Sequence, residues 1–178
     1  MYQQVLDWLQ EAPFSDPDKI RLRPNFSYEA WFARGRSIPH ITEALINLLE
    51  QEDTQHPSGN GMRVAYALGF LGNRGDKRAI KTLLASIQST DITLRIEAVA
   101  ALGRLGDERV LPVLENLLLD KNEDLNVRAN ACIAIGRLGI PSSQGILRNA
   151  LSDSDPFIAR CAEEALRLLG ASAPPVSK

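Results

Sequence analysis

The sequence predicts an all-α protein, a right-handed α-solenoid of about four to five helix pairs behind an N-terminal helical cap. Related blocks of sequence recur at a nearly constant spacing, and apolar residues within each block follow the period of a helix. Each block also ends in a glycine, directly after its last periodic apolar residue. A unit of this size cannot bury its apolar face alone, so neighbouring units must complete one continuous core.

The repeat consists of four blocks: MRVAYALGFLG (62–72), LRIEAVAALGRLG (94–106), NVRANACIAIGRLG (126–139) and FIARCAEEALRLLG (157–170). Their closing glycines, Gly72, Gly106, Gly139 and Gly170, lie 34, 33 and 31 residues apart. A second apolar stretch follows each of the first three glycines. We therefore interpret each unit as a helix that ends in glycine, a tight turn and a second helix.

Small residues at fixed positions predict close contact between stacked helices. The residues Ala98, Ala101 and Leu102 recur one repeat later as Ala131, Ala134 and Ile135. Glycines at 103 and 136 permit tight helix contact, whereas Gly106 and Gly139 suit a left-handed C-terminal cap that needs no Cβ.

A charged pair also recurs, because Asp91 precedes Arg95 by four residues and Asp124 precedes Arg128 by four. Each aspartate is placed to cap a helix N-terminus, and each arginine to pair with it or with the next repeat's aspartate. We interpret the pairs as a structural ladder between repeats, with ligand binding as the alternative.

The first sixty residues differ from the repeats, and we divide the chain into residues 1–60, the repeats at 61–170 and a disordered tail at 171–178. The segment MYQQVLDWLQ predicts a cap helix that Pro13 stops. A loop follows, and then SYEAWFARGR and PHITEALINLLEQED predict a divergent helix pair that forms a degenerate first repeat. The segment EDTQHPSGNG predicts a flexible loop before the regular array.

Nine of the ten aromatic residues precede residue 71, and several of them lie among arginines. Such a cluster suits an acidic partner or a carboxylated planar ligand, since aromatic rings and guanidinium groups are common interface anchors. The alternative is a terminal cap that fills its core with aromatic rings and exposes a basic face. The candidate binding residues here are Arg21, Arg23, Tyr28, Trp31, Phe32, Arg34 and Arg36.

Other classes of function are disfavoured. The formal charge of -2 and the pI near 5.7 argue against nucleic-acid binding through an overall positive field. No stretch approaches the ~18 consecutive apolar residues of a membrane span, and the start lacks a signal-peptide pattern, so we expect a cytoplasmic protein. His40 and His56 lack metal-binding spacing, and Cys132 and Cys161 lie in helical patterns typical of buried apolar residues. We expect no catalytic residue and no metal.

A family resemblance adds to this interpretation. The pattern Asp-x3-Arg, followed by Ala-x2-Ala-Leu-Gly-Arg-Leu-Gly-Asp at 98–107, resembles the HEAT-like repeat of phycobilisome lyases, and the resemblance covers residues 61–170. It implies repeats that cradle a tetrapyrrole and its apoprotein, often in a heterodimer of two repeat proteins. Under this resemblance Arg34 or Arg36 would pair with bilin propionates, and Tyr28 or Trp31 would stack on the pyrroles.

Two functions follow. The first is a non-catalytic scaffold or adaptor, without a cofactor, whose concave surface is lined by the second helices and grips a protein partner. Exposed candidates on those helices are Lys81, Gln88, Glu115, Asn116, Arg148 and Asn149. The alternative is a phycobilin lyase-related subunit or a bilin or phycobiliprotein chaperone, with a bilin as cofactor and a phycobiliprotein or second repeat subunit as partner.

Overall fold

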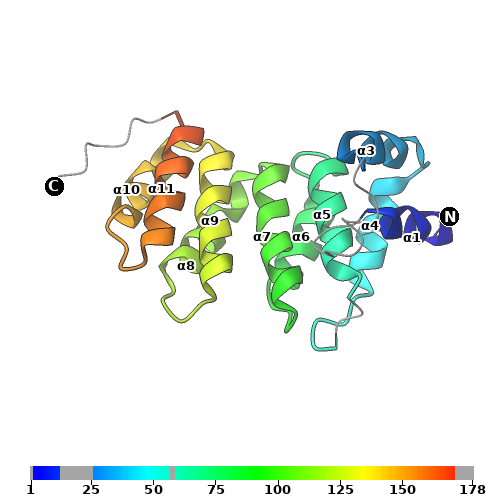
Figure 1. Ribbon diagram of the computed structural model, residues 1–178, viewed down its shortest axis with the longest axis horizontal. Helices are drawn as coiled ribbons and strands as arrows, with labels where there is room; N and C mark the ends of the chain where they lie inside the picture. Colours follow the sequence, from blue (N-terminus) through cyan, green and yellow to red (C-terminus); the bar gives the residue numbers. More distant parts are fainter. Residues whose placement is uncertain (1, 13–25, 57–58, 171–178) are drawn as a thin grey trace.

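The computed structural model describes residues 2–12, 26–56 and 59–170 of the chain. Figure 1 shows an elongated array of helices, and no strand occurs among the residues described. Short 3-10 turns at Glu108–Val110 and Pro141–Ser143 lead into α8 and α10. The α-helices are α1 (Tyr2–Glu11), α3 (Tyr28–Ser37), α4 (Ile41–Glu50), α5 (Gly61–Leu71), α6 (Lys77–Ser86), α7 (Ile92–Leu105), α8 (Leu111–Leu119), α9 (Leu125–Leu138), α10 (Gln144–Ala150) and α11 (Pro156–Leu168).

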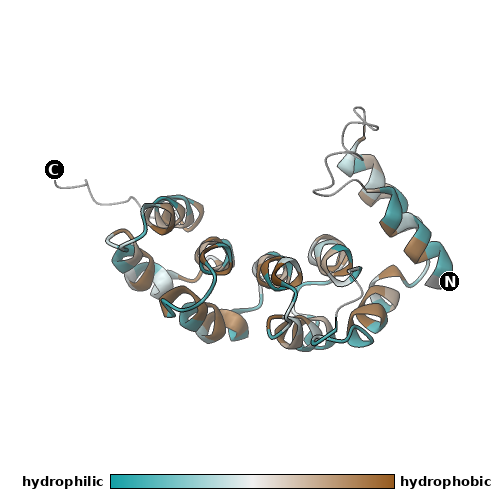
Figure 2. Cartoon of the chain, turned by 60° about the horizontal axis from the view of Figure 1, so that its bottom comes forward, coloured by the Kyte–Doolittle hydropathy of each residue, from teal (hydrophilic) through white to brown (hydrophobic). Residues whose placement is uncertain are grey.

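The helices form an α-solenoid of two rows. Helix α4 packs against α5, α6 against α7, α8 against α9 and α10 against α11, which gives four antiparallel pairs. Within one row, α5, α7, α9 and α11 pack directly side by side. Figure 2 shows that the array is curved and that this row lies on the inside of the curve. We call α5, α7, α9 and α11 the inner row and α4, α6, α8 and α10 the outer row.

This arrangement corrects the predicted phase of the repeat. The helix that ends in the closing glycine is the second member of its pair, because it packs on the helix that precedes it. The helices expected to line the concave surface are therefore the outer row. A periodic sequence looks the same wherever the repeat is divided, so the spacing of the glycines does not reveal which neighbours pair.

Close contacts between small residues explain why the array curves toward the inner row. A Cβ atom built on Gly103 of α7 would lie 2.6 Å from the Cβ of Ala134 on α9, and one built on Gly136 would lie 2.6 Å from the Cα of Ala165 on α11. The same contact joins Gly69 of α5 to Ala101 of α7. Backbones that approach this closely shorten the inner row relative to the leucine-rich outer row, and the array bends. The predicted contacts of the two glycines in the GRLG segments are confirmed.

The recurring charged pairs act in two separate ways. Asp91 and Asp124 cap α7 and α9, because their carboxylates accept hydrogen bonds from backbone N–H groups of the first turn. Arg95 instead pairs with Glu123, in the connection before α9. Arg128 likewise pairs with Asp153, in the connection before α11. Both arginines therefore reach an acid of the following repeat rather than the aspartate that caps their own helix.

Arg128 has an exposed fraction of 5%, and its donors are satisfied. Its Nη2 donates to Asp153 at 2.6 Å, and its Nε donates to the carbonyl of Leu118 at 3.1 Å. Burial opposes ionisation of Asp153, but hydrogen bonds from Lys121, the Asp155 amide and Arg128 outweigh it and hold the pKa of this carboxyl at about 2. The ladder interpretation is thus supported by a buried ion pair that joins two repeats.

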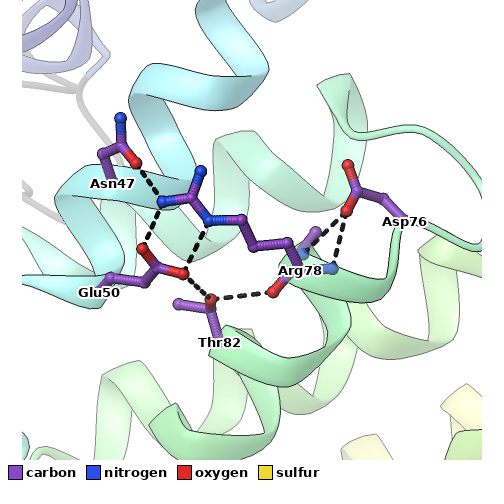
Figure 3. A network of polar contacts seen from close by, with 6 residues as sticks. Asn47, Glu50, Asp76, Arg78 and Thr82 are labelled. Carbon is purple, nitrogen blue, oxygen red and sulfur yellow. Dashed lines mark hydrogen bonds and ion pairs between the residues drawn. The ribbon is translucent and has the colours of Figure 1, made fainter.

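The outer row has its own polar network between α4 and α6 (Figure 3). The Arg78 guanidinium donates to both carboxylate oxygens of Glu50, at 2.9 and 2.5 Å, and also reaches Asn47. Thr82 donates to the same carboxylate at 3.3 Å. Hydrogen bonds from Arg78 lower the pKa of Glu50, so the carboxylate stays charged and ties the two helices together.

The N-terminal helices cover the first pair. Helix α1 packs against α4 and α5, and α3 packs on α5 rather than forming a pair with α4. Val5 and Leu9 of α1 are buried, whereas Trp8 stacks on Trp31 of α3 with ring centroids 4.1 Å apart. The predicted tail at 171–178 lies outside the described residues.

Candidate functional site

An aromatic cluster lies where α3 meets the first inner helix. It consists of Tyr28 and Phe32 from α3 and Tyr66 and Phe70 from α5, which we call the concave aromatic cluster. The centroid of the Phe32 ring is 4.6 Å from that of Phe70 and 5.9 Å from that of Tyr66. The ring of Tyr28 is 6.1 Å from Tyr66. Aromatic pairs at these separations attract one another, so the four rings form one continuous surface.

Helix geometry places this cluster on the concave side. Leu68 of α5 is fully buried between the two rows. Residues two positions away on a helix point about 200° from it, so Tyr66 and Phe70 both point away from the outer row. Phe70 has an exposed fraction of 43% and Tyr28 one of 37%, and the half-buried Tyr66 links them, with its ring centroid 5.0 Å from that of Phe70 and 6.1 Å from that of Tyr28. Gathered aromatic surface of this kind is typical of interaction sites.

Arg104 of α7 extends the cluster along the curve. Its Cζ lies 4.4 Å from the centroid of the Phe70 ring and 5.3 Å from that of Tyr66, in cation–π contact with both. Glu97 lies 3.6 Å from the same guanidinium, too far for a hydrogen bond. Burial raises the pKa of Glu97 despite the adjacent guanidinium, and it lowers the pKa of Arg104. This ion pair is therefore only partly satisfied at the concave surface.

The structure separates the aromatic and basic residues proposed from the sequence. Trp31 is fully buried and Phe32 has an exposed fraction of 7%, because both fill the space between α1, α3 and α5. The stacking of Trp31 on a bilin, expected from the resemblance, would require this packing to open. Tyr28 alone of the three stays exposed. The buried position of Trp31 fits the alternative interpretation, in which aromatic rings fill the core of a terminal cap.

The structure also places the predicted arginines in different surroundings. Arg34 pairs with Glu11 of α1 on the surface, and Arg36 lines a pocket with Pro39, His40 and Arg78 at the turn before α4. Arg21 and Arg23 lie outside the described residues.

The six candidates from the apolar stretches after the glycines are distributed along the outer row. Lys81 lies on α6 and Gln88 follows it, Glu115 and Asn116 lie on α8, and Arg148 and Asn149 lie on α10. Two shallow pockets include members of this set. One is lined by Lys81 with Ile80 and Leu84 between α6 and the 3-10 turn that precedes α8, and the other by Asn149 with Leu119 between α8 and α10. They do not converge on one site, and they face away from the concave aromatic cluster.

Sequence reasoning did not single out Phe70, Arg104 or Arg137 as site residues. Each stands two positions before a closing glycine, at a place that holds Phe, Arg, Arg and Leu in the four blocks, whereas the next residue is leucine in every block. The residue two positions earlier is apolar in every block and therefore faces the core. A variable position on the opposite side of the same helix is the sequence signal for the concave surface.

The cysteines and histidines do not form a reactive centre among the residues described. No group of three or more His, Cys, Asp and Glu side chains there is arranged to hold a metal ion. Burial raises the pKa of the Cys132 thiol to about 12 and also raises that of Cys161, so neither is a ready thiolate near neutral pH. Within the same described ranges, no helix has the length and apolar character needed to cross a membrane.

Comparison with known proteins assigns the fold to a class. The family model for HEAT repeats matches residues 42–126 and 118–176, and the chain belongs to this family. The chain is 32% identical over 119 residues to the phycocyanobilin lyase subunit alpha of a Picosynechococcus species. That match covers 66% of this chain and 44% of the lyase subunit, so the chain spans less than half the length of this relative. The resemblance noted from the repeat motif is confirmed.

A solved structure agrees with this fold. Human deoxyhypusine hydroxylase in complex with glycerol superposes with a TM-score of 0.60 at 19% sequence identity, over 95% of this chain and 62% of that one. At this identity the likeness concerns the helical array alone.

Proposed function

We propose that this chain is a non-catalytic scaffold that binds a protein partner along its concave face, with the concave aromatic cluster as the anchor. The observation that carries the proposal is the exposed surface of Tyr28 and Phe70 beside the Arg104 guanidinium. Tyrosine and arginine are enriched among residues that dominate binding energies, and central aromatic anchors contribute most when a partner excludes water from them. Stacked repeats present such anchors on an extended surface.

The test is affinity capture from a lysate of the source cells, with the bound proteins quantified by mass spectrometry. Phe70→Ser removes an exposed anchor from the concave face. The matched control is Leu119→Ser, which removes a side chain of 58% exposed fraction from the outer row. We expect the first variant to lose a specific partner by about tenfold or more and the second to retain it. Equal loss in both variants, or loss only in the control, would show that the concave face is not the binding surface.

The relative that carries phycocyanobilin in its name favours a second candidate function. Under it, the chain is a subunit or chaperone related to the phycobilin lyases, and its partner is a phycobiliprotein or a second repeat subunit. Tyr28 is exposed at the first residue of α3, where its ring could contact a tetrapyrrole, and Arg36 is exposed in the last turn of the same helix.

Visible absorption of a bound pigment distinguishes the second candidate function from the first. The purified chain is incubated with phycocyanobilin, freed of unbound pigment and scanned for visible absorption. A retained absorption band that Tyr28→Ala or Arg36→Ala reduces would support a bilin function. A colourless chain that still captures its partner through Phe70 would leave the protein-binding scaffold as the function.

A further inference from the structure

One position of the repeat forms a line across the concave face. Phe70, Arg104, Arg137 and Leu168 each stand two residues before a closing glycine, on the four successive helices of the inner row. We call these four residues the concave row. Its chemical order is apolar, cationic, cationic, apolar.

The burial pattern fixes the direction in which the concave row points. Two residues earlier on each helix stand Leu68, Leu102, Ile135 and Leu166, and all four have an exposed fraction of 0%. These side chains fill the space between the rows, so the concave row points about 200° away from it, into the hollow of the curve. Phe70 and Leu168, the two ends, have exposed fractions of 43% and 42%.

The middle of the row offers positive charge. Arg137 is exposed, whereas Arg104 is half-buried beside Phe70 and Glu97. Two acids lie near Arg137: Glu97, which stands 3.6 Å from Arg104 without a hydrogen bond, and Glu164, which accepts two hydrogen bonds from Arg167 at 2.7 and 2.6 Å. Arg104, Arg137 and Arg167 outnumber Glu97 and Glu164 by one charge, so the centre of the row is positive although the whole chain carries a net charge of -2.

We propose that the concave row binds an extended acidic segment of the partner protein, with an apolar side chain at each end and carboxylates between them. This inference rests on the proposed function and names the chemistry of its partner. Neighbouring packed helices lie about 8–10 Å apart, so three steps span about 24–30 Å. A chain in the polyproline II conformation rises about 3.1 Å per residue and has three residues per turn, so residues three apart project to the same side and a segment of about nine or ten residues matches the row.

Each part of such a segment meets a complementary group. The apolar ends contact Phe70 and Leu168, and the carboxylates approach Arg137 and the outer edge of Arg104. Guanidinium groups bind carboxylates through paired hydrogen bonds, and a stacked guanidinium such as that of Arg104 keeps its edge available for them.

The probe is a fluorescein-labelled peptide, FSGESGESGL, in which successive functional residues are three apart, which is one turn or about 9 Å in the polyproline II conformation. Its binding to the full chain is measured by fluorescence anisotropy. Two control peptides replace both glutamates by lysine or both apolar ends by serine. We expect the acidic probe to bind, each control peptide to bind roughly tenfold more weakly, and the affinity of the acidic probe to fall as salt is raised.

The protein variants form a matched pair. Arg137→Gln on the inner row is expected to weaken the probe by about fivefold or more, and Arg148→Gln on the outer row to leave it unchanged. Circular dichroism melting curves establish that both variants fold. Equal binding of acidic and basic probes, or equal loss in the two variants, overturns the proposal.

Two further outcomes separate this inference from the proposed function. If the probe fails to bind while Phe70→Ser still abolishes partner capture, the partner has another chemistry and only the inference is lost. If both experiments fail, the scaffold function is lost as well. A dimer in sedimentation velocity that dissociates in Phe70→Ser would instead make a second copy of the chain the occupant of the row and overturn the inference.

Discussion

Trp8 and Trp31 form a reciprocal pair: their indole rings stack at an interplanar angle of 8°, and each indole N–H donates to the other residue's backbone carbonyl, at 2.9 and 2.8 Å. Gly35 provides the space, because any Cβ there would collide with the Trp8 ring. The contact thereby joins α1 and α3, two helices that residues 13–25 separate in the sequence. The pair anchors the cap on which Tyr28 and Phe32 of the concave aromatic cluster depend.

Trp8→Phe keeps a ring in the stack but removes one indole donor and leaves the carbonyl of Trp31 without that bond. We expect the free energy of unfolding to fall by about 1–3 kcal/mol. Urea unfolding followed by circular dichroism at 222 nm measures it. Gln4→Ala, on the exposed face of the same helix, is the control and is expected to change stability by less than about 0.5 kcal/mol. A Trp8→Phe variant as stable as this control would contradict a structural role for the reciprocal bonds.

Gly103→Ala tests the contact that bends the array. The new methyl group would meet both the Cα and the Cβ of Ala134, so two helix backbones must move apart, at a cost of about 1–3 kcal/mol. Gly145→Ala is the matched control, because a Cβ at this helical position meets nothing within 4 Å. There alanine is expected to stabilise the protein by about 0.5–1 kcal/mol through its higher helix propensity. Thermal unfolding of the two variants should therefore shift in opposite directions, and a shared direction would refute the packing argument.

The pKa of Asp153 predicts an acid-sensitive contribution to stability. Its folded-state pKa of about 2 lies below the ordinary value of 3.8, so the stabilisation is present above pH 3.8 and is lost as pH falls toward 2. The difference corresponds to about 2 kcal/mol. Urea midpoints measured between pH 5 and pH 2 should decline for the wild type, and Asp153→Asn should flatten that decline while lowering stability at neutral pH. Glu163→Gln, on the exposed face of α11, serves as the control. An unchanged decline in Asp153→Asn would show that another group titrates.

Thiol labelling tests the burial of the cysteines. With a pKa of about 12, the Cys132 thiol is almost fully protonated at pH 8, and its side chain is fully buried. In the Cys161→Ala variant, a thiol reagent is expected to label Cys132 only after urea unfolds the chain. In Cys132→Ala, the half-buried Cys161 should react in the folded state, more slowly than a free thiol. Rapid labelling of native Cys132 would contradict the packing of α9 against α11.

Local features of the fold were predictable from the sequence because their causes are local. The helix caps at Asp91 and Asp124 and the left-handed glycines 106 and 139, with φ of 66° and 69°, depend on a few neighbouring residues. The pairing of helices depends on which faces meet in three dimensions, and a repeating sequence offers two equivalent ways to divide it. That ambiguity placed Lys81 and Arg148 on the concave side in the sequence interpretation, whereas the structure places them on the outer row.

The candidate site was predictable only in part for the same reason. Tyr28 was identified because aromatic residues cluster in the sequence near arginines. Arg104 was not, because its contact with Phe70 joins residues 34 positions apart and appears only when two helices stack. Pairing of Arg95 and Arg128 with the next repeat was among the predicted alternatives, but the acids are Glu123 and Asp153, which precede the capping Asp124 and Asp155 by one and two residues.

The two rows also differ in how they resist deformation. Inner helices touch through glycine and alanine at the backbone, while in the outer row shallow pockets lie between α6 and the Glu108–Val110 turn and between α8 and α10. We therefore expect the inner row to resist changes in helix spacing more than the outer row, because its backbones are already in contact. Bending of the array is then expected to change the spacing of the outer helices while the spacing of the helices across its hollow stays constant.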